Sequence, residues 1–356
     1  MDAKITKLRL SRLLSYDWLK IVGLSVAFII VWTLIFTMTA TRVLPSQQFT
    51  VINYTSNNSL GDGFYKSISK AKESGVFSYE VIENTTVDLR ASGDSANTIL
   101  EARFTTDEGD AIFVSGAGNP KYPVIDELTE EEVYDVTTDS DGNERKTLRC
   151  QATYLETFIS GWYYNLELLK EGDEDQQTFF EELEDYLARF YTDWRDETEE
   201  LSEDAKALIE KDFRKRAKGD KRYKTAKQIN KAVQNEILRV EQSRTSLLKF
   251  YDFLDKGYIE LTDFTYEDAE TGETVNLGSY AINLCPDERM DSLKNIVSYT
   301  QTWYDADDKA HYETTARDMH IILLDLGGID ECFKFEALNY VVYLVESCCT
   351  ELNPKN

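Results

Sequence analysis

Residues 49–54 (FTVINY) and residues 111–114 (AIFV) begin and end the stretch that decides the fold. Both are short apolar runs that contain β-branched and aromatic side chains and are bounded by turn residues, so each predicts a buried strand. A third run, residues 77–82 (FSYEVI), predicts another strand between them. The stretch therefore contains three predicted strands.

The interval between the first two strands predicts a helix. Its apolar residues recur at steps of three and four, which places them on one face of a helix. This stripe consists of Leu60, Phe64, Ile68 and Ala71. Gly75 follows the stripe and is expected to close the helix as a C-cap residue.

The interval before the third strand predicts a second helix. Its apolar face includes Ile99 and Phe104, and it is expected to begin near Ser92, Asp94 or Ser95, which are all good N-cap residues. Strands that alternate with helices in this way favour parallel pairing with right-handed crossovers. The whole stretch thus predicts a βαβαβ unit, which is half of an open α/β sheet.

Downstream of this unit, the sequence predicts a hairpin, a helical region and a returning strand. Residues 132–137 and 145–154 flank Asp141-Gly142, a pair that is typical of a two-residue hairpin turn. Residues 156–256 have a helical pattern almost throughout, and residues 280–284 predict a buried strand.

The C-terminal part predicts a second hairpin around Thr271-Gly272 and then two helices broken at Gly327-Gly328. Five segments follow from these patterns. They are a cytoplasmic basic tail (1–20), a transmembrane helix (21–41), the first part of an α/β lobe (42–155), a helical lobe (156–256), and the return strand or strands with C-terminal helices that complete the α/β lobe (257–356).

The predicted transmembrane helix rests on residues 21–40, which carry no formal charge. At about 1.5 Å per residue, such a helix crosses a hydrocarbon core of about 30 Å. Five Lys and Arg residues precede this run, whereas only Arg42 closely follows it, so the N-terminus is expected in the cytoplasm and the bulk of the chain outside. A cleaved signal peptide is the alternative, but its apolar region is usually shorter and ends in a small-x-small site that this sequence matches poorly.

The composition of the chain excludes one broad class of function. With 65 Asp and Glu against 39 Lys and Arg, the formal charge is −26. Nucleic-acid binders bring positive charge to phosphates, so no nucleic-acid partner is expected. The 42% of apolar residues in 356 is enough to build a core.

The residues that usually carry catalysis are sparse. The two His and five Cys stand in no ligand-spaced cluster, so no zinc site is expected. Oxygen ligands from residues 139–144 could hold calcium, but the distal Glu of a full calcium loop is missing, so a plain turn is favoured and neither a metal nor a cofactor is expected. Residues 67–70 satisfy the pattern Ser-x-x-Lys, but the Lys-Thr-Gly of the penicillin-recognising enzymes does not follow. Carboxylate pairs are too numerous to single out a general acid and base. We therefore expect a protein that is not an enzyme.

Two loops at one edge of the predicted sheet form a candidate ligand-binding site. The carboxyl ends of parallel strands lie at the same edge, where ligands of open α/β sheets gather, although two ordinary turns are the alternative. An aromatic cluster farther along could stack on a sugar ring, although a place in the core is the alternative. The candidate residues are Asn53, Tyr54, Ser56, Ser115, Gly116, Gly118 and Trp162.

A basic block interrupts the acidic chain. Residues 205–227 contain ten Lys and Arg and three Asp and Glu, a net charge of +7. Such a block could hold an anionic partner, such as a phosphate-bearing wall polymer, lipid headgroups or an acidic protein, although a solvated helix pair is the alternative. The candidate residues are Lys211, Arg214, Lys215, Arg216, Lys221 and Arg222.

The order of these pieces resembles the bacterial extracellular solute-binding proteins. It is also similar to single-span membrane proteins of clostridial Firmicutes, in which a Tyr-Asp-Trp-like triplet (here residues 16–18) precedes the span and a basic Phe-x-Lys-Arg…Asp-Lys-Arg-Tyr stretch (here residues 213–223) follows later. The resemblance implies a periplasmic-binding-protein-like, two-lobed ectodomain. One departure is that a helix replaces the lipidated Cys from which such proteins usually hang, which leaves room for a fixed sensor or an assembly factor.

Two functions from different classes follow. The first is a single-pass protein of the cell membrane, anchored in the bilayer through residues 21–40, that captures a small ligand in an interlobe cleft without catalysis. The second is a scaffold of the cell envelope whose basic helices bind an anionic polymer or a membrane-protein partner. A polar, aromatic-lined pocket between residues 53–56 and residues 115–118 would favour the first. Loops that pack shut, with a basic helix pair that stands free, would favour the second.

Overall fold

The computed structural model describes residues 7–39, 48–54, 62–77, 83–88, 95–106, 108–138, 142–162, 179–220, 222–267, 274–324 and 335–354. The chain divides into two compact units, Met1–Leu44 and Pro45–Asn356. The first contains helix α1 (Lys7–Thr39), whose side chains are described at residues 18, 20 and 22–36. Over the part of the chain that is described, no helix combines the length and the apolar character needed to cross a membrane.

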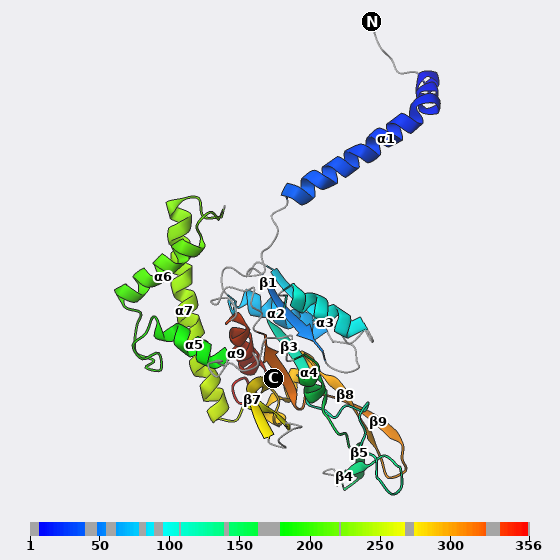
Figure 1. The fold of residues 1–356 in the computed structure, drawn as a ribbon, viewed down its shortest axis with the longest axis vertical. Helices are drawn as coiled ribbons and strands as arrows, with labels where there is room; N and C mark the ends of the chain where they lie inside the picture. The colour runs from blue at the N-terminus through cyan, green and yellow to red at the C-terminus, as the bar shows by residue number, and fades with distance from the viewer. Residues whose placement is uncertain are drawn as a thin grey trace. The chain divides into compact units, whose positions relative to one another are not determined.

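A six-stranded sheet forms the centre of the second unit (Figure 1). Its order is β2-β1-β3-β10-β7-β6, with β1 parallel to β2 and β3, and with antiparallel pairing from β3 through β10 and β7 to β6. The strands are β1 (Gln48–Asn53), β2 (Glu83–Asp88), β3 (Ala111–Ser115), β6 (Glu260–Glu267), β7 (Thr274–Asn283) and β10 (Met319–Leu323).

Helices cover both faces of this sheet because successive side chains of a strand point to opposite faces. Val51 of β1 packs with α2 (Asp62–Glu73) and α9 (Glu336–Cys348), whereas its neighbour Ile52 packs with α3 (Ala96–Thr105) and α4 (Tyr154–Trp162). Both residues are fully buried. The central strands therefore have continuous apolar sequences rather than alternating ones.

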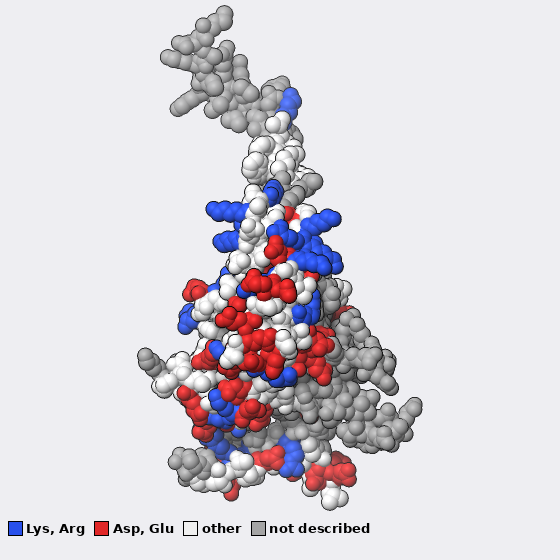
Figure 2. All heavy atoms as spheres, turned by 90° about the vertical axis from the view of Figure 1, so that its left-hand side faces the viewer, with Lys and Arg blue, Asp and Glu red and all other residues white. Residues whose placement is uncertain are grey.

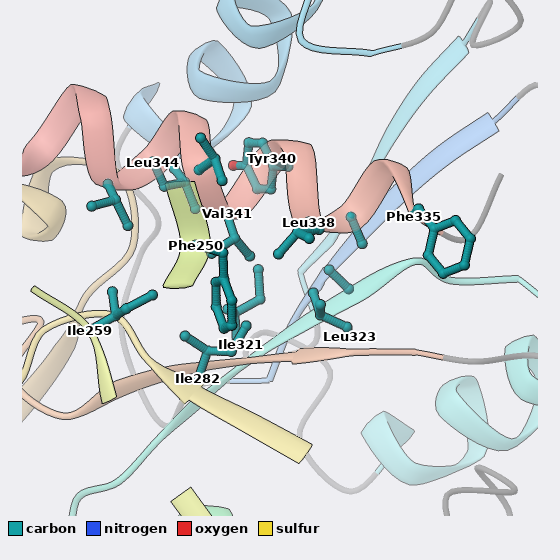
Figure 3. Close-up of a cluster of buried hydrophobic side chains, with 14 of the residues drawn as sticks. Phe250, Ile259, Ile282, Ile321, Leu323, Phe335, Leu338, Tyr340, Val341 and Leu344 are labelled. Carbon is teal, nitrogen blue, oxygen red and sulfur yellow. The ribbon is translucent and has the colours of Figure 1, made fainter. Parts of the chain in front are cut away.

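Figure 3 shows the core on the α9 side of the sheet. Val341 and Leu344 of α9 meet Ile282 of β7 and Ile321 of β10, and Phe250 lies among them. All of these side chains are at most 1% exposed. Phe250 belongs to α7, so this core joins the helical region to the sheet.

The helical region consists of α5 (Phe179–Ala188), α6 (Glu203–Arg216) and α7 (Ala226–Asp255). Ser202 caps α6 by accepting a hydrogen bond of 3.1 Å from the backbone N–H of Ala205. Thr225 and Gln228 form a capping box at the start of α7. These caps satisfy backbone groups that the first turn of a helix leaves without partners.

A second, four-stranded antiparallel sheet has the order β4-β5-β8-β9. Its strands are β4 (Tyr134–Thr138), β5 (Glu144–Leu148), β8 (Tyr299–Tyr304) and β9 (Ala310–Thr315). A 3-10 helix, η3 (Glu288–Asn295), precedes β8. This sheet joins the predicted hairpin of residues 132–154 to strands from the C-terminal third of the chain.

Several predictions are confirmed. Strands form at both ends of the stretch 49–114 and pair in parallel, and the chain is a mixed α/β protein. Gly75 has a φ of +73° just after α2, and the next residue, Val76, donates from its N–H to the carbonyl of Ala71 at 3.0 Å. This is the left-handed termination that glycine favours.

Two predictions are wrong. The second strand is Glu83–Asp88 rather than residues 77–82; residues 78–82 lie outside the described part, and the ring of Phe77 packs in the core 4.3 Å from that of Phe49. Before Gly327-Gly328, β8, β9 and β10 occupy residues where a helix was expected. The glycine pair itself lies outside the described residues, and α9 is the helix that follows it.

Candidate ligand pocket

A pocket of about 380 Å³ lies between the loop that follows β3 and the second sheet. The loop contributes Ala117, Gly118 and Pro120, and Tyr154 of α4 joins them. The other lining residues are Thr147, Leu148, Cys150, Tyr299, Thr300, Gln301, Thr302, Tyr304 and Tyr312. None of these residues is charged, although 29% of the chain is.

Backbone hydrogen bonds tie this loop to the start of α4. Tyr154 donates from its N–H to the carbonyl of Ala117 at 2.9 Å, and Asn119 donates to that of Ala152 at 2.8 Å. Gly118 packs so closely on Cys150 that a Cβ there would stand 3.0 Å from the sulfur. A side chain at this position would therefore push the Cys150 side chain aside where the loop meets the wall of the pocket.

Aromatic side chains of β8 and β9 form much of the opposite wall. Tyr299 is 3% exposed and donates from its hydroxyl to the carbonyl of Arg317 at 2.9 Å. Tyr304 packs edge-on against Tyr134 at 5.6 Å, and Tyr312 is 73% exposed. Tyr299 thus forms a fixed floor, while Tyr312 presents its ring at the open side.

Two side chains of this pocket, Tyr299 and Cys150, have raised pKa values. Burial raises the pKa of Tyr299 to about 12. Burial, with the nearby charge of Glu132, also raises the pKa of the Cys150 thiol. Because the thiolate is the nucleophilic form, Cys150 is poorly suited to attack at neutral pH. The lining residues can therefore bind a ligand through aromatic ring faces, hydroxyl groups and an amide group.

The predicted binding residues fall into two groups. Gly118 lines the pocket, but Ser115 and Gly116 pack shut: the Ser115 side chain accepts from the N–H of Ala117 at 3.0 Å, and Gly116 donates from its N–H to the carbonyl of Asp318 at 2.7 Å. A Cβ on Gly116 would stand 2.8 Å from the ring of His320.

The end of β1 does lie beside the end of β3, as expected. Tyr54 donates from its N–H to the carbonyl of Phe113 at 2.9 Å. Asn53 is fully buried, and the hydroxyl of Tyr54 donates to Asn97 at 3.0 Å, so neither residue lines the pocket. Ser56 and the side chain of Trp162 lie outside the described residues.

The tyrosines of β8 and β9 were not among the binding residues predicted from the sequence. The alternation in YTQTWY (299–304) and AHYETT (310–315), with Asp305 to Asp308 between them, is a hairpin signal that could have found them. Their approach to Gly118 could not be found in this way, because it depends on pairing between β5 and β8, which are far apart in the chain.

The basic block is less free than its charge suggests. Arg214 pairs with Glu210 at 2.6 Å, Arg222 pairs with Asp220 at 2.5 Å, and Arg216 pairs with the buried Glu236. Lys211 and Lys215 are exposed, and Lys221 lies outside the described residues. On the face drawn in Figure 2, Lys and Arg still gather toward one end of the second unit while acidic side chains predominate elsewhere.

Comparison with known proteins adds no family to this description. No protein family, no curated protein and no solved structure was found to match the chain. The pocket and the basic helices are therefore the features on which a functional argument rests.

Proposed function

We propose that this chain is a membrane-anchored binding protein that captures a small, uncharged, polyhydroxylated ligand of the carbohydrate class. The observation that carries the proposal is the uncharged, tyrosine-rich lining of the pocket beside Gly118. Tyrosine rings offer apolar faces with polar edges, and hydroxyl and amide groups fix orientation, which together suit a sugar ring.

The charge of the lining sets the ligand class. A charged ligand would have to enter a lining that contains no side chain of opposite charge, at a desolvation cost that nothing there offsets. A neutral ligand with many hydroxyls instead exchanges its hydrogen bonds with water for bonds to Thr300, Gln301 and Thr302. Cys150 and Tyr299, held neutral, support capture rather than catalysis.

The anchor in this proposal is the charge-free run of residues 21–40, with the basic tail inside the cell and the second unit outside. The pocket lies beyond the carboxyl end of β3, where ligands of open α/β sheets gather, and it is bounded by the second sheet rather than by the helical lobe of the expected cleft. A fixed helical anchor would keep the pocket at the membrane surface, where a sensor or a partner of a membrane complex would need it.

Thermal unfolding of the full chain in phosphatidylcholine nanodiscs tests this function. A ligand that binds only the native state raises the midpoint in a saturable way. We expect such a rise with one neutral saccharide from a panel that also contains amino acids, peptides and acidic sugars. Tyr304→Ala and Tyr312→Ala should each weaken that binding about tenfold, because each removes a ring face.

Tyr122→Ala is the matched control, because Tyr122 is 46% exposed in the same region but does not line the pocket. No rise with any saccharide, or equal weakening by all three variants, would contradict a binding role for the pocket. Binding to an anionic wall polymer alone, lost when Lys211 and Arg214 are neutralised, would instead favour the envelope scaffold.

A further inference from the structure

We propose that a second cavity, between α5, α6 and α7, binds a small dianionic ligand of the phosphomonoester class. The cavity has a volume of about 420 Å³. Its lining residues are Tyr186, Arg189, Phe190, Ile209, Asp212, Phe213, Lys215, Arg216, Glu236 and Arg239. It shares no lining residue with the tyrosine pocket, so this site is independent of the function proposed above.

The charge of this lining is opposite to that of the chain. Four lining residues are cationic and two are acidic, an excess of two positive charges, whereas the whole chain has a net charge of −26. A phosphomonoester carries a charge of about −1.5 to −2 at pH 7. The bound dianion would therefore balance the charge that the side chains bring to the cavity.

The arginines are held in place before any ligand arrives. Glu236 is 2% exposed and accepts hydrogen bonds from the guanidinium groups of both Arg239 and Arg216. Arg189 donates to Asp212 at 2.6 Å. Groups that are already ordered lose little conformational freedom on binding, so such a site is favourable for a small ligand.

Burial of one arginine and the geometry of the guanidinium groups favour a compact oxyanion as the ligand. Arg239 is 3% exposed and lines the cavity, and attraction between an anion and a buried charge is less screened than attraction at the surface. The planar guanidinium group matches the oxygens of a phosphate in a bidentate way. Phe190, Ile209 and Phe213 supply an apolar wall for the organic part of the ligand.

Isothermal titration of the full chain in phosphatidylcholine nanodiscs with glycerol 3-phosphate tests the proposal, with glycerol as the uncharged comparison. We expect saturable binding of glycerol 3-phosphate only. Arg189→Gln should weaken it at least tenfold, and Lys215→Gln about fivefold, because each removes one charge from the lining. Circular dichroism and the unfolding midpoint would verify that both variants fold.

Lys211→Gln is the matched control, since Lys211 is also an exposed lysine of α6 but does not line the cavity. Unchanged affinity in this variant is expected. No binding of glycerol 3-phosphate at millimolar concentration would overturn the proposal. So would equal weakening by Lys211→Gln and Lys215→Gln, because that result would reflect the general field of the basic helices.

A further arm identifies the source of the phosphate group. Vesicles of phosphatidylcholine with and without phosphatidic acid present the same chemistry on a lipid. If phosphatidic acid vesicles compete with glycerol 3-phosphate, and this competition is lost in Lys215→Gln, the site binds a lipid headgroup. If the vesicles have no effect, the site binds a soluble ligand. Tyr304→Ala should leave phosphate binding intact, so failure of the tyrosine pocket and failure of this site are distinguishable.

Discussion

The side-chain Oδ2 of Asp110 accepts a hydrogen bond of 2.6 Å from the backbone N–H of Thr50 in the interior of the protein. The backbone N–H of Asp110 in turn donates to the carbonyl of Thr50 at 2.9 Å. The two residues thus extend the pairing of β1 and β3 by one position, since the strand register begins at Val51 and Ala111. Asp110 is a buried carboxyl group that serves the central sheet.

This contact predicts a pH dependence of stability. Burial and the negative charge of the nearby Glu336 raise the pKa of Asp110, whereas the hydrogen bond from the N–H of Thr50 lowers it. The net result is a pKa of about 7. The folded protein then binds a proton that the unfolded chain has already released, so the stability that this proton contributes is lost as the pH rises toward 7 and above. Between pH 5.5 and 7.5 the loss amounts to about 2 kcal/mol.

Urea unfolding of residues 45–356, with and without Asp110→Asn, checks this prediction at pH 5.5 and 7.5. The difference in unfolding free energy between variant and wild type should shift by about 2 kcal/mol in favour of the variant at the higher pH. Burial lowers the pKa of His320, which acts in the opposite direction, but His320 is present in both proteins. Asp126→Asn should give no such shift, because hydrogen bonds from the N–H groups of Thr129 and Leu128 lower the pKa of that carboxyl group.

Gly63 near the start of α2 should not tolerate a side chain. A Cβ at this position would lie 1.6 Å from the backbone carbonyl oxygen of Asn295, so α2 and η3 would have to move apart. Gly63→Ala is expected to destabilise the protein by about 3 kcal/mol or more. Gly161→Ala in α4 meets no atom within 4 Å and should be neutral or stabilising by about 0.5–1 kcal/mol. Equal midpoints of thermal unfolding for the two variants would refute this close packing.

The buried charges of α7 should contribute far more than the exposed pairs of α6. Glu236→Gln leaves Arg239, whose side chain is 2% exposed, without its carboxylate partner, and should cost roughly 3–5 kcal/mol. Glu210→Gln breaks the exposed pair with Arg214 and should cost less than about 1 kcal/mol. Denaturant unfolding of both variants measures this contrast, and a cost below about 1 kcal/mol for Glu236→Gln would show that the buried pair adds nothing to the fold.

Ser67 is expected to have a structural role despite its place in a Ser-x-x-Lys sequence. Its hydroxyl lies 2.8 Å from the carbonyl of Phe64 and 2.9 Å from the hydroxyl of Tyr340, and both side chains are buried. Ser67→Ala and Tyr340→Phe should each cost about 1–3 kcal/mol. In a double-mutant cycle their coupling should be about 1 kcal/mol; a coupling near zero would argue against the hydrogen bond.

Local patterns predicted more of the fold than of the candidate sites. The spacing of Phe64, Ile68 and Ala71 and the C-cap at Gly75 depend on neighbours within a few residues, and both are present in the structure. The position of β2 was missed because Glu83–Asp88 is polar and is a strand through its pairing with β1. Side-chain patterns could not show this, since strand propensity depends strongly on the partner strand.

The sequence by itself determined the order of the first helices and strands, the acidic charge of the chain, the charge-free run of residues 21–40 and the basic block. Only the tertiary structure decided that Gly118 faces the tyrosines of β8 and β9, and that Glu236 draws Arg216 and Arg239 to the wall of a cavity. The physical reason is that helix and strand periodicity is a property of adjacent residues, whereas pockets and buried charge pairs arise where segments distant in the sequence pack together.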